Sequence, residues 1–414
     1  MKDIEQQQTA QNRSRRDFVT AVATLGASAA LTNALPAWGQ EKPKPPAEPG
    51  GTVSNAAVLA EKDAVMRPHS ERPLTASVTA EYLADDVTPS NRHFIRNNLF
   101  TPDFDAAKHM VEVTGLVSTP MRFALADLRG KFPEASAQAM VECAGSGRTA
   151  FTPAPRGTPW PVTGGMSCSR WTGVRLADVL RAAGVKPGAV HVAFTGADFG
   201  ALPTIPKVAR SIPLDKAMER HTLLAYGMNG GPLPKIHGFP LRVIVPGWVG
   251  SASIKWVSRI EVLDAPLKGP YMDESYRIPR NPVEPGGKMP ADAAITEAWP
   301  VKSIITNPAP SLQTALGRPL LVAGKAWAGD TGIARVDLSF DEGRTWQRAE
   351  LGASAEKYAW RTFSYAHTPK RPGYSTVLAR ATDEAGNTQP VVSPWNPLGY
   401  FWNGWHRVGF TITA

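Results

Sequence analysis

A change in hydrophobic pattern near residue 286 constrains the fold of this 414-residue chain more than any other feature. Before Pro285-Gly286-Gly287, strand-like runs mix with short helical patterns, and glycine and proline interrupt both, so a regular doubly wound sheet is not indicated. After it, segments of alternating apolar and polar residues follow one another at a spacing typical of a β-sandwich. Because 414 residues exceed what one hydrophobic core usually serves, we expect an α+β domain followed by an all-β sandwich.

The periodicities place the elements of both domains. In the first domain they predict strands at 110–117, 190–194, 241–245 and 256–263, and helices at 124–129, 176–183 and 214–220. In the second they predict strands at 320–328, 334–340, 345–351, 359–365 and 376–382.

The N-terminus has the features of a twin-arginine export signal. Ser14-Arg15-Arg16-Asp17-Phe18-Val19 precedes a weakly apolar stretch that is short for a bilayer. We therefore expect a periplasmic protein with residues 1–40 as its signal peptide and no membrane span. The Pro-rich composition that follows predicts a linker over residues 41–74.

The chain is basic, with a formal net charge of +9. Such a surplus suits an anionic substrate or an acidic protein partner, whereas export makes nucleic acid the weakest choice. No long run of lysine and arginine occurs, so a solvated basic surface is the simpler interpretation.

Cys143 is the position at which chemistry is most expected, since the chain has only two cysteines. It lies in Glu142-Cys143-Ala144-Gly145-Ser146-Gly147-Arg148, where small residues leave room for a large group and a cation favours the thiolate, the form that binds metals. An inert buried thiol, or a disulfide with Cys168, is the alternative. There is no Cys-x-x-Cys-His motif for covalent haem and no cysteine cluster for iron–sulfur or structural zinc.

Four cationic side chains stand in loop-like sequence contexts: Arg96, Arg148, Arg242 and Lys255. Each alone is typical of a surface cation. Together with a cysteine in a Gly-rich turn, they could line a pocket for a phosphate-bearing cofactor and a small oxyanion, which arginine binds through its planar fork.

A series of ordered motifs identifies a family. The motifs are Phe-x-Arg-Asn at 94–97, Glu-Cys-Ala-Gly-x-x-Arg at 142–148, Arg-Trp-x-Gly-Val at 170–174, Leu-Ala-Tyr-x-Met-Asn-Gly at 224–230, His-Gly-Phe-Pro-x-Arg at 237–242, Val-Pro-Gly at 245–247, Ile-Lys-Trp at 254–256, Asp-x-Gly-x-Thr-Trp at 341–346 and Trp-His-Arg-Val at 405–408. With these motifs the chain resembles the sulfite oxidase family of molybdenum enzymes, specifically the bacterial periplasmic sulfite dehydrogenases without a fused haem domain.

The resemblance implies a role for each matching position. Cys143 is expected to be the thiolate ligand of molybdenum, whose other sulfur ligands come from the dithiolene of one molybdopterin. Arg96 and Arg148 are expected to hold the anion, with Tyr276 in the active site and Trp160 against the substrate. The expected pterin and phosphate contacts are Ile95, Arg96, Asn97, Asn98, Leu99, Asp198, His237, Arg242, Ser253, Ile254 and Lys255.

The resemblance also implies an organisation and an activity. Residues 75–285 would form the molybdopterin-binding catalytic domain, and residues 286–414 an immunoglobulin-like dimerisation domain. The enzyme would oxidise sulfite to sulfate as a homodimer. It would pass electrons to a separate c-type cytochrome, because the chain has no motif for a second redox centre.

Two departures keep the substrate open. Many family members have histidine where this chain has Asn98, and the animal enzymes place an arginine where Leu398 falls. One alternative is therefore a sulfane-sulfur dehydrogenase subunit of a thiosulfate-oxidising complex. A second is a periplasmic sulfoxide reductase of the same cofactor class, although such reductases typically lack the sandwich. A third is a binding protein that kept the fold without catalysis.

Overall fold

The computed structural model describes residues 51–103, 105–353 and 356–414. These all belong to one of the two units into which the chain divides, Glu48–Ala414. The predicted signal peptide, 1–40, lies outside the described residues. None of the helices in the described ranges has the length and apolar character needed to cross a membrane.

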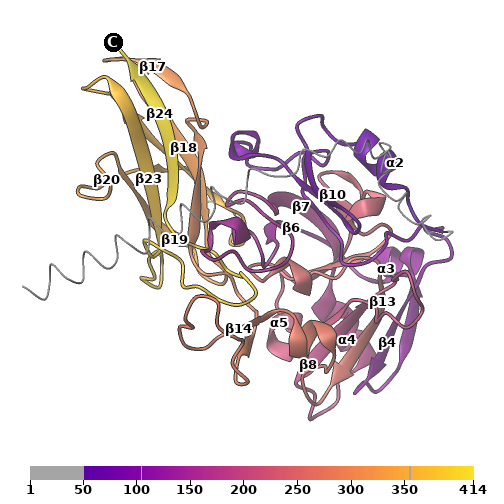
Figure 1. The fold of residues 1–414 in the computed structure, drawn as a ribbon. Coiled ribbons are helices and arrows are strands. Elements are labelled where there is room, and N and C mark those ends of the chain that lie inside the picture. The colour runs from indigo at the N-terminus through magenta and orange to yellow at the C-terminus, as the bar shows by residue number, and fades with distance from the viewer. Residues whose placement is uncertain (1–50, 104, 354–355) are drawn as a thin grey trace, which may run out of the picture. The chain divides into compact units, whose positions relative to one another are not determined.

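Two five-stranded sheets form the first domain, one mixed and one antiparallel (Figure 1). One has the strand order β5-β4-β13-β8-β9, and β13 and β4 are its parallel pair. Its strands are β4 (Met110–Gly115), β5 (Met121–Ala124), β8 (His191–Gly196), β9 (Ala209–Pro213) and β13 (Val257–Leu263). The other has the order β11-β10-β7-β6, and β12 pairs with β10. Its strands are β6 (Glu134–Glu142), β7 (Met166–Arg175), β10 (Leu223–Met228), β11 (Gly231–Pro232) and β12 (Arg242–Ile244).

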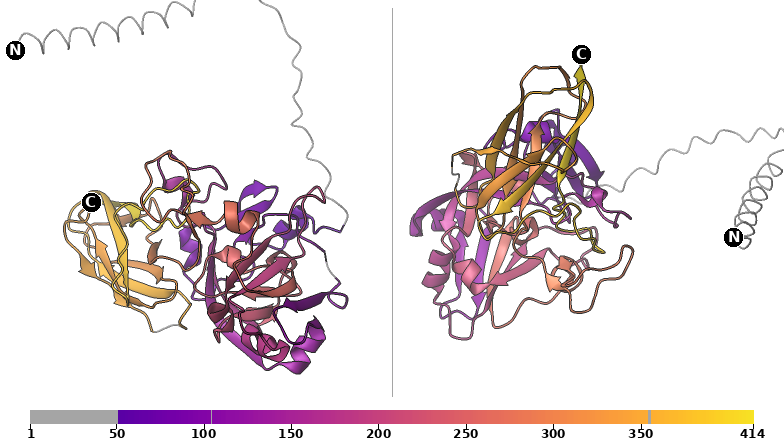
Figure 2. Two further views of the ribbon diagram at one scale, coloured as in Figure 1. Left: turned by 90° about the horizontal axis from the view of Figure 1, so that it is seen from below. Right: turned by 90° about the vertical axis from the view of Figure 1, so that its left-hand side faces the viewer.

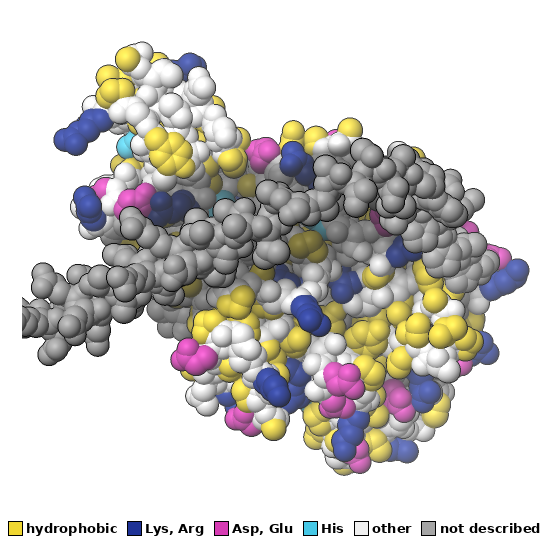
Figure 3. Space-filling model, in the orientation of Figure 1, with side chains coloured by type: hydrophobic (Ala, Val, Ile, Leu, Met, Phe, Trp, Pro, Cys, Tyr) yellow, Lys and Arg dark blue, Asp and Glu magenta, His cyan; other side chains and the backbone are white. Residues whose placement is uncertain are grey.

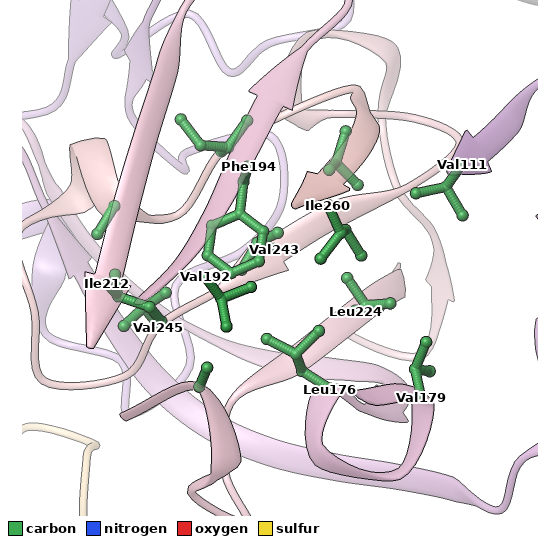
Figure 4. Close-up of a cluster of buried hydrophobic side chains, with 14 of the residues drawn as sticks. Val111, Leu176, Val179, Val192, Phe194, Ile212, Leu224, Val243, Val245 and Ile260 are labelled. Atoms are coloured by element: carbon green, nitrogen blue, oxygen red, sulfur yellow. The ribbon is translucent and has the colours of Figure 1, made fainter. Parts of the chain in front are cut away.

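Short helices complete this domain and close its core. The α-helices are α3 (Leu125–Lys131), α4 (Leu176–Ala183) and α5 (Leu214–Met218). Apolar side chains of both sheets meet α4 in one buried cluster, in which Phe194 and Ile260 face Leu224 and Leu176 (Figure 4). Burial of this cluster fixes the two sheets against each other, so that the loops at their ends are held in place.

The segment before this domain corrects the linker prediction. Of residues 41–74, the described part is folded: α2 (Asn55–Ala60), β1 (Arg67–Glu71) and β2 (Leu74–Ser77) form elements, and β1 and β2 form a three-stranded sheet with β3 (Ile95–Arg96). Val58 and Leu74 are buried in a cluster that also contains Trp327 of the second domain. The Pro-rich composition ends near Gly51, and the apolar residues beyond it are sufficient to bury.

The second domain is a sandwich, as predicted, drawn in orange and yellow in Figure 1 and Figure 2. Its sheets have the orders β16-β18-β22-β21 and β17-β24-β23-β19-β20. The strands are β16 (Lys302–Asn307), β17 (Gln313–Ala315), β18 (Leu320–Trp327), β19 (Ile333–Ser339), β20 (Gln347–Arg348), β21 (Glu350–Leu351), β22 (Arg361–His367), β23 (Gly373–Asp383) and β24 (His406–Thr413). Inward-facing residues such as Val322, Phe363 and Phe410 form its core.

Short elements connect these parts. They are the 3₁₀ turns η1 (Ala80–Leu83), η2 (Arg148–Ala150), η3 (Lys235–His237) and η4 (Gly250–Ala252), the single π-turn η5 (Pro270–Glu274), and the pair β14 (Arg277–Ile278) and β15 (Ala294–Ile295). On the face shown in Figure 3, basic and acidic side chains are interspersed over the part of the surface that is not grey.

Candidate active site

Cys143 follows the last residue of β6 and begins a tight turn. Its N–H donates to Gly165 O at 2.8 Å, and its own carbonyl accepts from Ser146 N at 2.8 Å. A side chain on Gly165 would stand 3.3 Å from Cys143 Cβ, so glycine keeps the space beside the thiol open. Cys143 is half-buried and lines a cavity with an empty volume of about 710 Å³.

The second cysteine has a different environment. Cys168 lies in β7, fully buried, and burial raises the pKa of its thiol to about 12. Both cysteines are free, so the disulfide alternative is wrong in this structure. Cys168 is therefore an inert packed thiol, as expected of a buried sulfur that stays protonated.

The cavity brings together most of the predicted site residues. Arg96, Asn97, Asn98, Cys143, Asp198, His237, Arg242, Ser253, Ile254, Lys255 and Tyr276 all line it. They come from five stretches of chain: around β3, just after β6, just after β8, from η3 to the start of β13, and between η5 and β14.

Lys255 and Arg242 are two neighbouring cations in the cavity wall. Arg242 donates to the carbonyls of His237 and Ser253 at 2.9 and 3.1 Å, while its Nε has no partner. Lys255 donates to Ile236 O at 3.0 Å and to the side chain of Asn97. Neither forms an ion pair with a described carboxylate within 4 Å, and desolvation lowers the pKa of Arg242 to about 9 and that of Lys255 far below its usual value. A phosphate placed here would favour the charged forms of both side chains and so raise their pKa values again.

Asp198 shows the opposite effect near the same cations. Burial raises the pKa of its carboxyl to about 7, and its Oδ1 has no hydrogen-bond partner. Partly protonated at neutral pH, this carboxyl can both donate and accept, which suits the heterocycle of a pterin.

These residues fit a molybdopterin that carries the metal. Across the described residues, no three His, Cys, Asp or Glu side chains are grouped so that they could hold a metal alone. A single thiolate is sufficient when the cofactor brings its own sulfur ligands. The unpaired Arg242 Nε, Lys255 and Asp198 then provide the partners for its polar groups.

Around Tyr276, the cavity wall contains a polar chain. Arg96 Nη2 donates to Asn98 Oδ1 at 2.8 Å, and Asn98 Nδ2 lies 3.3 Å from Tyr276 Oη. The Tyr276 ring stacks on Tyr400, with centroids 5.7 Å apart and planes 11° apart. Asn98 therefore orients both the arginine and the tyrosine.

Four predicted residues do not line the cavity. Arg148 is buried and donates to Leu398 O at 3.1 Å and Thr158 O at 2.8 Å. Trp160 is fully buried, edge-on to Phe94, and its Nε1 has no partner. The remaining two are Ile95, which packs in the apolar core, and Leu99, which borders a smaller neighbouring cavity. Their roles remain predictions.

The sequence did not reveal several residues of this site. Lys62 Nζ lies 2.6 Å from His237 Nε2, and desolvation lowers its pKa to about 7. No signal pointed to it, because residue 62 fell in the expected linker. His93 was also missed: its ring centroid lies 4.7 Å from that of His237, but it stands just before the motif that begins at Phe94. Tyr400 was missed because it belongs to the second domain, where no site residue was expected.

Comparisons with known proteins agree with this site. The family described as oxidoreductase molybdopterin binding domain matches residues 98–271, and the Mo-co oxidoreductase dimerisation domain matches residues 293–413. Mitochondrial sulfite oxidase of Rattus norvegicus is 34% identical over 386 residues, which cover 89% of this chain and 69% of the rat protein. Sulfite oxidase of Arabidopsis thaliana is 32% identical over 366 residues, which cover 82% of this chain and 91% of the plant protein.

A solved structure has a similar fold. The sulfane dehydrogenase SoxCD from Paracoccus pantotrophus matches with a TM-score of 0.71 at 27% sequence identity, over 92% of this chain and 96% of that one. Fold, cavity and comparisons together define a molybdenum-dependent oxidoreductase that binds molybdopterin. The chain belongs to the sulfite oxidase family. The predictions of family, fold class, enzyme class and cofactor are thereby confirmed.

Proposed function

We propose that this protein is a periplasmic sulfite dehydrogenase that oxidises sulfite to sulfate and passes the electrons to a separate c-type cytochrome. The observation that carries the proposal is one cavity lined by the half-buried Cys143, by the hydrogen-bonded Arg96–Asn98–Tyr276 group and by the cations Arg242 and Lys255. Similarity to sulfite oxidases supports the choice of substrate.

Each group of residues has a distinct task in this proposal. When bound, molybdenum with its molybdopterin transfers an oxygen atom to the sulfur of sulfite and accepts two electrons. Arg96 attracts the dianion and stabilises the charge as the product forms, since its orientation is already fixed by Asn98. Tyr276 donates its hydroxyl hydrogen to substrate oxygen. Lys255 and Arg242 hold the cofactor phosphate.

The cellular setting is part of the proposal. The twin-arginine motif at 14–19 supports export, and the dimerisation domain at 293–413 supports a homodimer. A basic protein would attract an acidic cytochrome, and the rate of electron transfer would fall as salt rises.

Steady-state oxidation of sulfite by protein with measured molybdenum content tests the proposal. The rate should follow molybdenum occupancy with either ferricyanide or a cytochrome c as acceptor. Loaded protein that leaves sulfite unchanged with both acceptors would overturn it.

A second candidate is the oxidation of sulfane sulfur bound to a carrier protein. The structural match to a sulfane dehydrogenase over 96% of that chain favours it. Two departures from the family pattern also favour it: Asn98, where many family members have histidine, and Leu398, where the animal enzymes place an arginine. Parallel assays with sulfite and with a persulfidated peptide distinguish the two. Faster turnover of the persulfide would favour this second function.

A further inference from the structure

Arg210 carries a buried positive charge that the proposed function does not yet use. It lies in β9, is 1% exposed, and donates from its two terminal nitrogens to Ser251 Oγ at 3.2 Å and Thr296 O at 3.0 Å. Its Nε has no partner. Within the ranges that the structure describes, no carboxylate lies within 4 Å of the guanidinium, so its charge has no direct counter-ion.

This charge persists at neutral pH. Burial lowers the pKa of Arg210 to about 10, while Tyr276, Tyr400 and Glu297 favour its charged form. An unpaired buried cation is costly, and such groups are retained where they act on another charge.

The guanidinium forms one end of a stack that reaches the cavity. Its central carbon lies 4.8 Å from the centroid of the Tyr276 ring, which stacks on Tyr400, and the central carbon of the Arg148 guanidinium lies 5.4 Å from the centroid of the Tyr400 ring. Each ring of the aromatic pair thus has an arginine close to it. Tyr276 and Ser251, both in contact with Arg210, line the cavity.

We propose that Arg210 is a positioning residue of the oxyanion site, which fixes Tyr276 and Ser251 and adds positive potential where a dianionic substrate binds; this inference rests on the proposed function. The cation holds the ring by a cation–π contact and Ser251 by a hydrogen bond. Because Arg210 is buried, its charge is weakly screened and favours a dianion more than a monoanion.

Two variants separate charge from structure. Arg210→Gln can keep a hydrogen bond to Ser251 but removes the charge. Arg210→Lys keeps the charge but removes the planar guanidinium that donates from two nitrogens. Arg210→Met is a second neutral variant in case the glutamine variant does not fold. The matched control is Arg259→Gln, because Arg259 is an exposed arginine of the same domain that pairs with Glu261 at 3.1 Å.

The readouts are kcat and KM for sulfite, competitive inhibition by sulfate and by chloride, molybdenum content and thermal stability. A neutral variant should raise KM for sulfite and the inhibition constant for sulfate by about tenfold, with kcat changed less than about threefold and chloride inhibition changed less than sulfate inhibition. Arg210→Lys should recover most of the loss, and Arg259→Gln should match the unaltered protein.

Other results would refute the inference. It is wrong if a loaded neutral variant binds sulfite and sulfate within twofold of the unaltered protein, or if sulfate and chloride inhibition weaken equally. If the unaltered protein oxidises no sulfite, the proposed function fails by itself. Calorimetric titration of sulfate into the unaltered and neutral proteins then still decides the role of Arg210.

Discussion

A buried ion pair next to the predicted molybdenum ligand allows the strongest prediction. Lys302, at the start of β16 in the second domain, lies with its Nζ 2.7 Å from Oε1 of Glu142, and both side chains are fully buried. Lys302 also lies 3.2 Å from Ser146 Oγ, and Trp327 Nε1 donates to Glu142 Oε2 at 2.9 Å. The second domain therefore holds the residues on both sides of Cys143.

Replacing Lys302 by methionine should destabilise the protein strongly. The substitution leaves the Glu142 carboxylate buried with no positive partner, and breaking such a pair costs about 3–5 kcal/mol. Lys302 has similar length to methionine, so little of the loss comes from a cavity. The double variant Lys302→Met with Glu142→Gln should recover much of it, since a neutral amide can still accept from Trp327.

Urea unfolding of the apoprotein, followed by tryptophan fluorescence, measures the free energy of unfolding, and mass spectrometry measures the molybdenum content of the loaded protein. The control Lys108→Met removes an exposed pair with Asp105, 3.4 Å apart, and should change the free energy of unfolding by less than about 0.5 kcal/mol. If Lys302→Met unfolds within about 1 kcal/mol of the unaltered protein and keeps its molybdenum, the pair does not organise the Cys143 turn.

Three further outcomes are expected. Lys255→Met and Arg242→Met should each lose molybdopterin on gel filtration while the apoprotein stays folded, and full retention in both would exclude a phosphate site there. Apoprotein stability should fall as the pH rises from about 4 to about 7, because Asp198 in the folded protein, with its pKa raised to about 7, holds a proton that the unfolded chain has already released. Asp198→Asn should flatten this dependence of stability on pH, and an unchanged dependence would show that Asp198 does not cause it. Cys168→Ala should keep molybdenum and activity, since its buried thiol does not line the cavity that contains Cys143, and loss of either would show a missed role.

The sequence predicted those helices and strands whose own residues show both the periodicity and the end of the element. Helix α4 has the predicted bounds, because its apolar residues repeat at helical spacing and Gly184 ends it in a left-handed conformation, φ 69°. By contrast, β6 and β7 were missed. Their sequences, such as Glu-Ala-Ser-Ala-Gln-Ala-Met-Val-Glu, are rich in small residues with low strand preference, and pairing between the two strands determines their structure.

The same distinction applies to the site. Residues in motifs, such as Cys143 and Lys255, were identified because their neighbours match the family in order. Arg210 and Tyr400 were not, because their importance comes from a stack between β9 and the C-terminal segment, 190 positions apart in the chain. Lys62 was missed because a Pro-rich composition was extended beyond the residues that have it.

X-ray absorption at the molybdenum edge tests the central claim most directly, because it counts the sulfur atoms bound to the metal. The unaltered protein should show three molybdenum–sulfur bonds, two from molybdopterin and one from Cys143, whereas Cys143→Ser should show two and should not oxidise sulfite. Equal sulfur counts in the two loaded proteins would contradict the assignment of Cys143 as the ligand.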